Sequence, residues 1–302
     1  MITRLLRVCG LTLGALAIAG CSEASVDNEP QPSPNPPLYE ISNANGEVEG
    51  WMLGTIHALP GGVEWRTNAI DDAVENADFV IVEVANLDDR PALAKTFSIL
   101  ASSTGHAPLN DRINPDLRYQ LRELVAKSDY SDHDFSSTET WGAALMLART
   151  QSTGDPANGV DRAIIRDFSG REVIELEGAL GQLRIFDRLA EDDQRVLLEG
   201  VVIEASDPDA NPAQLREAWL SGDDTVLEQA TRTGIMADPD LHKALILDRN
   251  LAWAEQLELA LAKPEKPLIA VGAGHLVGDD SLNTMLKARG FTVTRIEQNT
   301  LP

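Results

Sequence analysis

Residues 268–275 read LIAVGAGH, an apolar run that ends in glycine and continues to a histidine. The same arrangement occurs near the start of the chain, where residues 51–57 read WMLGTIH. Each apolar run predicts a buried strand, and the glycine that closes it lets the backbone turn sharply. Open α/β sheets place their ligands at the carboxyl ends of their strands. We therefore expect His57 and His275 to share one site.

Other segments predict the rest of the sheet and the helices. Residues 79–84, FVIVEV, form an apolar run interrupted only by Glu83, which is typical of a strand covered on both faces. Most of the remaining chain has a helical pattern. Further strands are expected at residues 38–42, 47–53, 172–177 and 291–296. The sequence therefore predicts an α/β fold: a mixed, mostly parallel sheet flanked by helices, with a helical cap that is inserted in the middle of the chain and covers the carboxyl edge of the sheet.

Two glutamates complete the expected site. Glu83 interrupts one apolar strand, and Glu177 ends another. A buried carboxylate is costly unless it is paired or bound to a cation. Two imidazoles and one or two carboxylates at one sheet edge suit Mn, Fe, Co or Zn, and such a metal lowers the pKa of a bound water to about 7. The simpler alternatives are histidines that only cap loops, and a Glu83 that faces solvent from an edge strand. Of Glu175 and Glu177, one is expected to be exposed and the other functional.

The first residues predict a lipoprotein signal. Residues 1–20 begin with basic side chains and contain a short apolar core, and residues 18–21 read IAGC, which resembles a bacterial lipobox. Cleavage would leave Cys21 as a lipidated first residue, with palmitate among its acyl chains, and Ser22 after it favours the outer membrane. An ordinary secretory signal is the alternative. The expected location is the cell envelope, with membrane contact through the N-terminal lipid.

Composition and charge limit the remaining possibilities. Residues 21–37 are polar and proline-rich and are expected to form a disordered tether, followed by the α/β domain at residues 38–302. The second cysteine, Cys9, lies inside the signal, so a cysteine zinc site and a cysteine nucleophile are excluded for the mature chain. The formal net charge of −23 repels nucleic acid, which is therefore not an expected partner.

Several short motifs have the order and spacing of one protein family. They are GTIH at 54–57, VIVE at 80–83, GVD at 159–161, LE at 176–177 with Gln182, RN at 249–250 with Trp253, and VGAGHLVG at 271–278. On these motifs the chain resembles the TraB/GumN family, which is related to the Tiki metalloproteases and more distantly to ChaN-like and erythromycin-esterase-like proteins. The resemblance covers residues 38–298. Gly178 stands where the family commonly has threonine, so Glu177 matches less well than Glu83.

The resemblance implies a metal-dependent hydrolase in which His57, Glu83 and His275 bind the metal. Tiki-like members cleave peptide bonds near the amino end of a substrate and depend on a divalent metal, which favours Mn or Co, with Zn or Fe as other candidates. Glu83 and Glu177 are then the candidate catalytic residues. The candidates for substrate binding are Asp161, Gln182, Arg249 and Asn250.

Two classes of function fit these observations. The first is a membrane-tethered hydrolase that acts on a peptide or a small molecule. The second is a non-catalytic lipoprotein that binds a peptide or haem, as ChaN-like proteins do. Paired buried carboxylates favour the first class, because haem ligation needs an axial ligand and an apolar slot. Simpler roles stay open for Arg249, a surface salt bridge, and for Asp161, a plain N-cap. The histidines expected at the surface are His106, His133 and His242.

Overall fold

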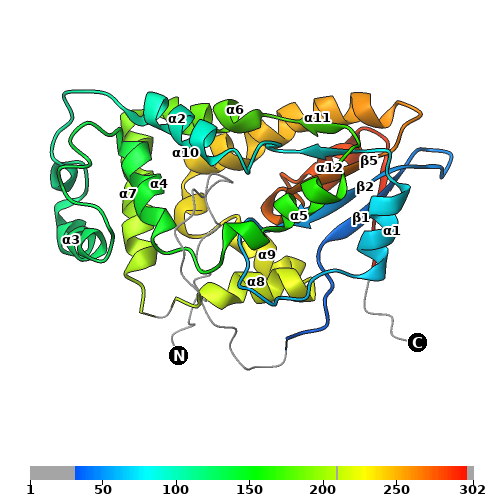
Figure 1. The fold of residues 1–302 in the computed structure, drawn as a ribbon, viewed down its shortest axis with the longest axis horizontal. Helices are drawn as coiled ribbons and strands as arrows, with labels where there is room; N and C mark the ends of the chain where they lie inside the picture. Colours follow the sequence, from blue (N-terminus) through cyan, green and yellow to red (C-terminus); the bar gives the residue numbers. More distant parts are fainter. Residues whose placement is uncertain (1–30, 209, 298–302) are drawn as a thin grey trace.

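The computed structural model describes residues 31–208 and 210–297, and strands from both ends of this part of the chain form one six-stranded sheet (Figure 1). The strands are β1 (Leu38–Ser42), β2 (Val48–Thr55), β3 (Phe79–Val82), β4 (Val173–Glu175), β5 (Pro267–Gly272) and β6 (Thr292–Arg295). Their order across the sheet is β4-β3-β5-β2-β1-β6. The first four run parallel to one another, whereas β1 is antiparallel to β2 and to β6. The predicted mixed, mostly parallel sheet is confirmed.

Helices fill most of the chain between the strands. They begin where the sequence provides caps: Asn211 and Asp238 each accept backbone hydrogen bonds at a helix start that has proline in its first turn. The α-helices are α1 (Asn68–Asn76), α2 (Arg90–Ala101), α3 (Arg118–Ala126), α4 (Thr140–Arg149), α5 (Val160–Asp167), α6 (Gly178–Asp187), α7 (Glu191–Ala205), α8 (Pro212–Ser221), α9 (Asp224–Ala230), α10 (Pro239–His242), α11 (Asp248–Leu261) and α12 (Leu282–Ala288). A π-helix, η5 (Lys243–Leu247), joins α10 to α11.

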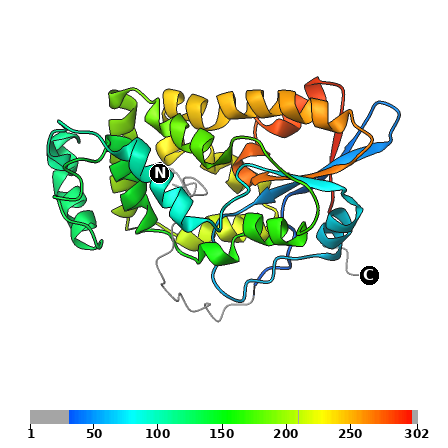
Figure 2. The same ribbon diagram turned by 45° about the horizontal axis from the view of Figure 1, so that its top comes forward.

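The two faces of the sheet bury their side chains against different helices. Leu53 and Val80 pack with apolar residues of α1, α5 and α8, whereas Met52 and Ile81 pack with residues of α11 and α12. This follows from the period of two along each strand, which sends successive side chains to opposite faces. Figure 2 shows α11 lying along the length of the molecule above the sheet.

The helical middle of the chain has a core of its own. Trp141 of α4 is fully buried and packs against Phe97 and Phe186, with ring centroids 5.5 Å and 6.2 Å away. Residues of α3, α4 and α7 contribute to this core, and Figure 1 shows these helices together at one end of the molecule. The predicted helical cap is therefore a separate packing unit that adjoins the sheet.

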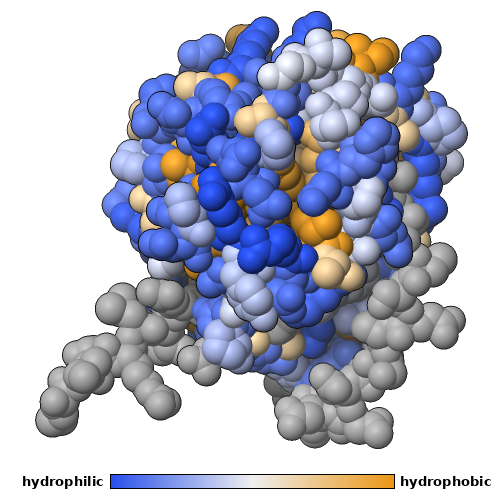
Figure 3. Space-filling view, turned by 90° about the vertical axis from the view of Figure 1, so that its left-hand side faces the viewer, coloured by the Kyte–Doolittle hydropathy of each residue, from blue (hydrophilic) through white to orange (hydrophobic). Residues whose placement is uncertain are grey.

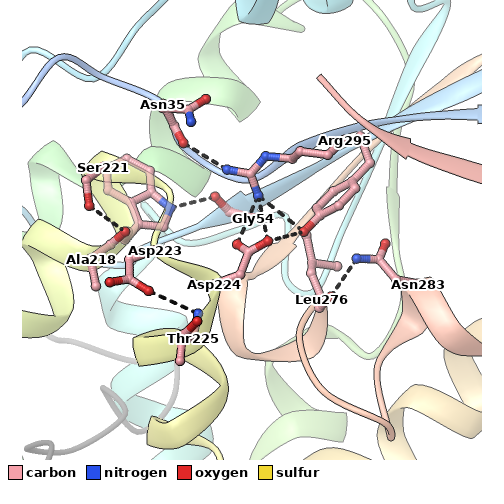
Figure 4. Close-up of polar contacts among 12 residues, drawn as sticks. Asn35, Gly54, Ala218, Ser221, Asp223, Asp224, Thr225, Leu276, Asn283 and Arg295 are labelled. Carbon is pink, nitrogen blue, oxygen red and sulfur yellow. Dashed lines mark hydrogen bonds and ion pairs between the residues drawn. The ribbon is translucent and has the colours of Figure 1, made fainter. Parts of the chain in front are cut away.

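The end of the expected tether packs against the domain. Pro37 accepts a hydrogen bond from the amide of Gly54 at 2.7 Å. Arg295 of β6 donates to the carbonyl oxygen of Asn35 at 2.9 Å (Figure 4). Both Asn35 and Pro37 are buried. The folded part of the chain thus begins a few residues before residue 38.

Polar residues dominate the surface at the helical end of the molecule. Figure 3 shows this face mostly hydrophilic, with hydrophobic residues visible in a furrow near its centre. Within residues 31–208 and 210–297, no helix is long and apolar enough to cross a membrane. The expected signal at residues 1–20 and the expected lipidation site Cys21 lie outside the described residues.

Candidate functional site

Four neighbouring parallel strands each present one chemically active side chain just beyond their carboxyl ends. His57 follows β2, His275 follows β5, Glu83 follows β3 and Glu177 follows β4. The register aligns these ends, because Thr55 pairs with Gly272 and Val82 pairs with both Ala270 and Glu175. The carboxyl ends of parallel strands share one sheet edge, so the sequence pattern alone brings the four side chains together.

Gly272 lies at the centre of this group. A Cβ atom at this position would lie 3.3 Å from Glu83 Oε1, 3.7 Å from His275 Cδ2 and 3.9 Å from His57 Nε2. The Gly272 amide also donates a hydrogen bond to Glu83 Oε1 at 2.7 Å. His57 and His275 thus lie together in one pocket, as expected from the sequence, and a larger residue at position 272 would crowd Glu83.

Arg249 of α11 links the two glutamates. Its Nη2 donates to Glu83 Oε2 at 2.6 Å and to Glu177 Oε2 at 3.1 Å, and its Nε donates to Glu177 Oε1 at 2.9 Å. Its Nη1 lies 3.0 Å from His275 Nε2 and donates to the Leu245 carbonyl oxygen at 3.1 Å. These contacts use all five N–H groups of the guanidinium. Arg249 is therefore a buried cross-link between strand ends and not a surface salt bridge.

The π-helix η5 precedes Arg249 directly and supplies one of its acceptors. Leu245 lies inside η5, and its carbonyl oxygen receives the Arg249 guanidinium. From the other side, the guanidinium carbon lies 4.6 Å from the centre of the Trp253 ring, a cation–π contact. Single π-helical turns are frequent at functional sites.

The charges in this cluster set the protonation states of the glutamates. Burial disfavours ionised Glu83, but the nearby Arg249 guanidinium outweighs burial and lowers the pKa of Glu83 to about 2. Burial raises the pKa of Glu177, and Arg249 only partly opposes this. The two carboxylates in turn raise the pKa of Arg249 against the effect of its burial. Two carboxylates with pKa values pushed apart are typical of sites that perform acid–base chemistry.

His275 is held on both ring nitrogens. Nδ1 lies 2.6 Å from Asn250 Oδ1, and Nε2 faces the Arg249 guanidinium. Because Arg249 can only donate, Nε2 is the acceptor and Nδ1 carries the proton. Burial and the Arg249 charge lower the pKa of His275 to about 3, so this imidazole is neutral. Asn250 is itself fixed, since its Nδ2 donates to the carbonyl oxygen of Asp280 at 2.7 Å.

His57 has a different environment. Its Nδ1 lies 3.3 Å from Asp161 Oδ2, and neither Nδ1 nor either Asp161 oxygen has a hydrogen-bond partner among the described residues. Burial alone would lower the pKa of His57, but the charge of Asp161, with a smaller contribution from Glu83, raises it above its ordinary value.

A close contact between backbones brings Asp161 to His57. The amide of Val160 donates to the Ile56 carbonyl oxygen at 2.9 Å. A Cβ atom at Gly159 would overlap the carbonyl oxygen of His57, so only glycine fits there. Asp161 lies in the first turn of α5, whose N-cap residue is Gly159. Asp161 therefore serves the histidine and is not a plain N-cap.

A pocket opens between these strand ends and the helical cap. Thr55, His57, Glu83, Gly272 and His275 line its sheet end, and Gln182 of α6 and Arg249 of α11 line it next to them. The rest of its wall is apolar and comes from α6, α8, α9, η4 (Gly234–Ala237) and η5. Gln182 Nε2 donates to Glu83 Oε2 at 3.0 Å. Glu177, Asn250 and Asp161 lie behind the lining residues and contact them.

The expected metal ligands come together, but they do not fit a metal ion as arranged. Within the described part of the chain, no group of three or more His, Cys, Asp or Glu side chains could hold a metal ion. The physical reason is Arg249, which occupies Glu83 Oε2 and the free lone pair of His275. A cation beside a guanidinium would also meet charge repulsion.

The structure gives two further residues a part in the site that the sequence did not predict. Thr55 Oγ1 is buried at the sheet end of the pocket and has no hydrogen-bond partner among the described residues. His242, expected at the surface, is partly buried and lies 3.0 Å from Asp280 Oδ2 and 2.9 Å from the Thr231 carbonyl oxygen. It thereby anchors the helix that leads to Arg249. Of the glutamate pair near β4, Glu175 is the exposed one.

Fold and site together define an α/β protein that has a pocket lined by buried ionisable side chains at the carboxyl edge of its parallel strands. More particularly, the chain belongs to the TraB/PrgY/gumN family, whose sequence profile matches residues 37–295.

Two curated relatives cover most of the chain. It is 26% identical over 252 residues to the "Uncharacterized protein YbaP" of Shigella flexneri, a match that covers 80% of this chain and 89% of the relative. It is also 26% identical over 246 residues to the "Uncharacterized protein YbaP" of Escherichia coli (strain K12), which covers 78% and 87% respectively. No solved structure matches the chain significantly.

Proposed function

We propose that this protein is a hydrolase of the cell envelope that cleaves a peptide or a small-molecule amide, with His57 as its general base. The proposal rests on the pair of His57 and Asp161. An imidazole stands at the edge of the pocket, 3.3 Å from a carboxylate that has no hydrogen-bond partner among the described residues. A base oriented by a third group is the arrangement that removes a proton from an attacking nucleophile.

The neighbours of His57 suit this role. Asp161 attracts the proton to Nδ1 and leaves Nε2 as the acceptor, on the side of Gly272 and the pocket. The ionised Glu83 favours the imidazolium that forms when Nε2 takes a proton from water. A general base works best when its pKa lies near the working pH, and Asp161 raises the pKa of His57 above its ordinary value.

Arg249 and Glu177 have supporting roles in this proposal. Arg249 keeps Glu83 ionised, and it binds a substrate carbonyl only by giving up one of its present partners, since all five of its N–H groups are used. Glu177 does not line the pocket and keeps the guanidinium in place during such an exchange.

Metal-dependent hydrolysis is the second candidate. It is favoured by the way the three expected ligands, His57, Glu83 and His275, surround Gly272. It requires that Arg249 release Glu83 and His275. Mn or Co, with Zn or Fe as further candidates, stay predictions from the family resemblance.

Hydrolysis of a peptide and amide library by the purified protein tests the proposal. We expect activity that survives EDTA and is lost in His57→Ala, whereas His133→Ala, which changes an exposed histidine, keeps it. Activity that EDTA abolishes and Mn²⁺ or Co²⁺ restores would select the metal-dependent candidate. Absence of hydrolysis together with tight haem binding, seen by absorbance, would favour the non-catalytic lipoprotein.

The envelope location is proposed on the lipobox-like residues 18–21. Cys21→Ser should abolish lipidation and either release the protein from the membrane fraction or leave it unprocessed. A Cys21→Ser protein that still fractionates as a lipidated membrane protein would contradict this part of the proposal.

A further inference from the structure

The helical end of the pocket has a composition that the proposed chemistry does not explain. It is lined by Phe186 of α6, Leu215 and Trp219 of α8, Leu227 of α9 and Met236 of η4. These residues come from four separate elements, yet each turns an apolar side chain to the same space. Such a surface gains free energy by releasing water when it covers an apolar group of a ligand.

The charges of the pocket are all at its other end. The charged or ionisable side chains that line it are His57, Glu83, Arg249 and His275, which stand at or above the strand ends. Because no ionisable side chain lines the helical end, a polar or charged ligand group there would lose its water without finding a partner. The pocket therefore distinguishes the two ends of its ligand.

Trp219 fixes the position of the apolar end relative to the strand ends. Its indole Nε1 donates to the carbonyl oxygen of Gly54 at 2.8 Å, a contact drawn in Figure 4 at the labelled Gly54. Gly54 lies three residues before the proposed base, His57. A ligand group on the indole therefore lies in the same pocket as the reacting centre and not at a remote subsite.

Two buried oxygen atoms at the sheet end lack partners. Thr55 Oγ1 and Gln182 Oε1 have no hydrogen-bond partner among the described residues, and both residues line the pocket. The Gln182 amide is oriented by its Nε2, which donates to Glu83, so Oε1 is available as an acceptor. Acceptors without donors fit a ligand that brings an N–H group.

From these features we infer that the substrate is an amide with a bulky aliphatic group next to the bond that is cleaved. The aliphatic group lies against Leu215 and Trp219, and the amide N–H donates to Thr55 Oγ1 or Gln182 Oε1. A leucine-like side chain and a fatty acyl chain offer the same chemistry to this wall. The inference rests on the proposed hydrolase function for the reaction, but binding can be measured without it.

Binding of two amide series to the purified full-length protein by calorimetry tests the inference. One series lengthens the acyl group of N-acyl-alaninamide from acetyl to hexanoyl, and the other enlarges the side chain of N-acetyl amino acid amides from alanine to leucine. We expect the affinity to rise about fourfold for each added methylene in at least one series, and the series that responds identifies the source of the group. An affinity that does not depend on aliphatic size in either series would overturn the inference.

Variants of Leu215 locate the effect. Leu215 is only partly buried, so Leu215→Trp fills the pocket at modest cost to the core. We expect Leu215→Trp and Leu215→Asn to abolish the gain from added methylenes. Leu180→Asn, at an exposed leucine of α6 outside the pocket, is the matched control. If the affinity of Leu215→Trp still rises with each added methylene as in the unmodified protein, the aliphatic group lies elsewhere and the inference is overturned.

The same ligands separate this inference from the proposed function. Size-dependent binding without any hydrolysis would leave the inference standing as a binding specificity and would end the proposal of a hydrolase. Hydrolysis at a rate that does not depend on aliphatic size would support the hydrolase and overturn the inference of an aliphatic specificity.

Discussion

The two Gly-x-x-His segments occupy equivalent places in the fold but have opposite electrostatic properties. Both histidines follow adjacent parallel strands, β2 and β5. His275 has partners on both nitrogens, and its pKa is lowered to about 3 by burial and by Arg249. His57 faces Asp161 without a hydrogen bond, and its pKa is raised.

The difference originates in the helices that meet each histidine. Arg249 and Asn250, both on α11, reach His275, whereas Asp161 on α5 reaches His57. A neutral, fully bonded imidazole gives the site rigidity. An imidazole paired with a carboxylate, with a buried hydroxyl of Thr55 nearby, is free to exchange a proton. Hence one repeated motif places two histidines in opposite electrostatic environments.

The contrast between the two histidines requires that His57, and not His275, is the reactive one. His57→Ala should lower kcat/KM by about 10²–10⁴-fold, the usual contribution of a general base. The melting temperature should fall only modestly, because buried Asp161 loses the imidazole that faces it but no hydrogen bond of His57 Nδ1 is lost. Steady-state kinetics and thermal denaturation measure the two effects, with His133→Ala as control. Equal loss of activity in both variants would contradict the assignment.

The strand-end placement of the four active side chains was predictable from the sequence, because it needs only apolar runs that end at glycine or glutamate. The identity of each partner was not. Asp161 and Arg249 lie about a hundred or more positions from His57 and Glu83, on helices whose direction is set by core packing. His242 was expected at the surface for the same reason, since its partner Asp280 becomes its neighbour only in the fold.

Replacing Arg249, which contacts His275, should have the largest effect on stability. Arg249→Met leaves Glu83 and Glu177 buried without their cation, which should cost about 3–5 kcal/mol in the free energy of unfolding. Chemical denaturation measures it. Arg195→Met, at an exposed i,i+4 pair with Glu191, should cost no more than about 0.5 kcal/mol. If both variants lose the same small amount of unfolding free energy, the ion pairs of Arg249 with Glu83 and Glu177 do not stabilise the fold.

The pH profile sharpens the contrast between the two histidines. His57 must be neutral to accept a proton, so kcat/KM should fall as the pH drops through its pKa, which lies above the ordinary 6.5. Asp161→Asn removes the main cause of the raised pKa and leaves the opposing effect of burial. The acid limb of the profile should therefore move to lower pH in this variant. An acid limb that stays in place would show that another group limits the activity.

The smallest expected effect concerns Thr55, whose hydroxyl is buried without a partner in the described part of the chain. Replacing a buried hydroxyl that makes no hydrogen bond with a methyl group of similar size removes only a desolvation cost, so Thr55→Val should keep or slightly raise the stability, within about 0.5 kcal/mol. Asn250→Ala, by contrast, removes the hydrogen-bond partner of His275 Nδ1. It should lower the free energy of unfolding by about 1–3 kcal/mol.

The value of Thr55→Val lies in combining this result with kinetics. If the hydroxyl is unpaired because it awaits a substrate N–H, the variant should raise KM for the amide substrate at unchanged stability. Chemical denaturation and steady-state kinetics on the same preparations give both quantities. A clear loss of stability in Thr55→Val would mean that the hydroxyl has a hydrogen-bond partner in the folded protein. The surroundings of His57 would then be closer to the fully hydrogen-bonded surroundings of His275 than the geometry indicates.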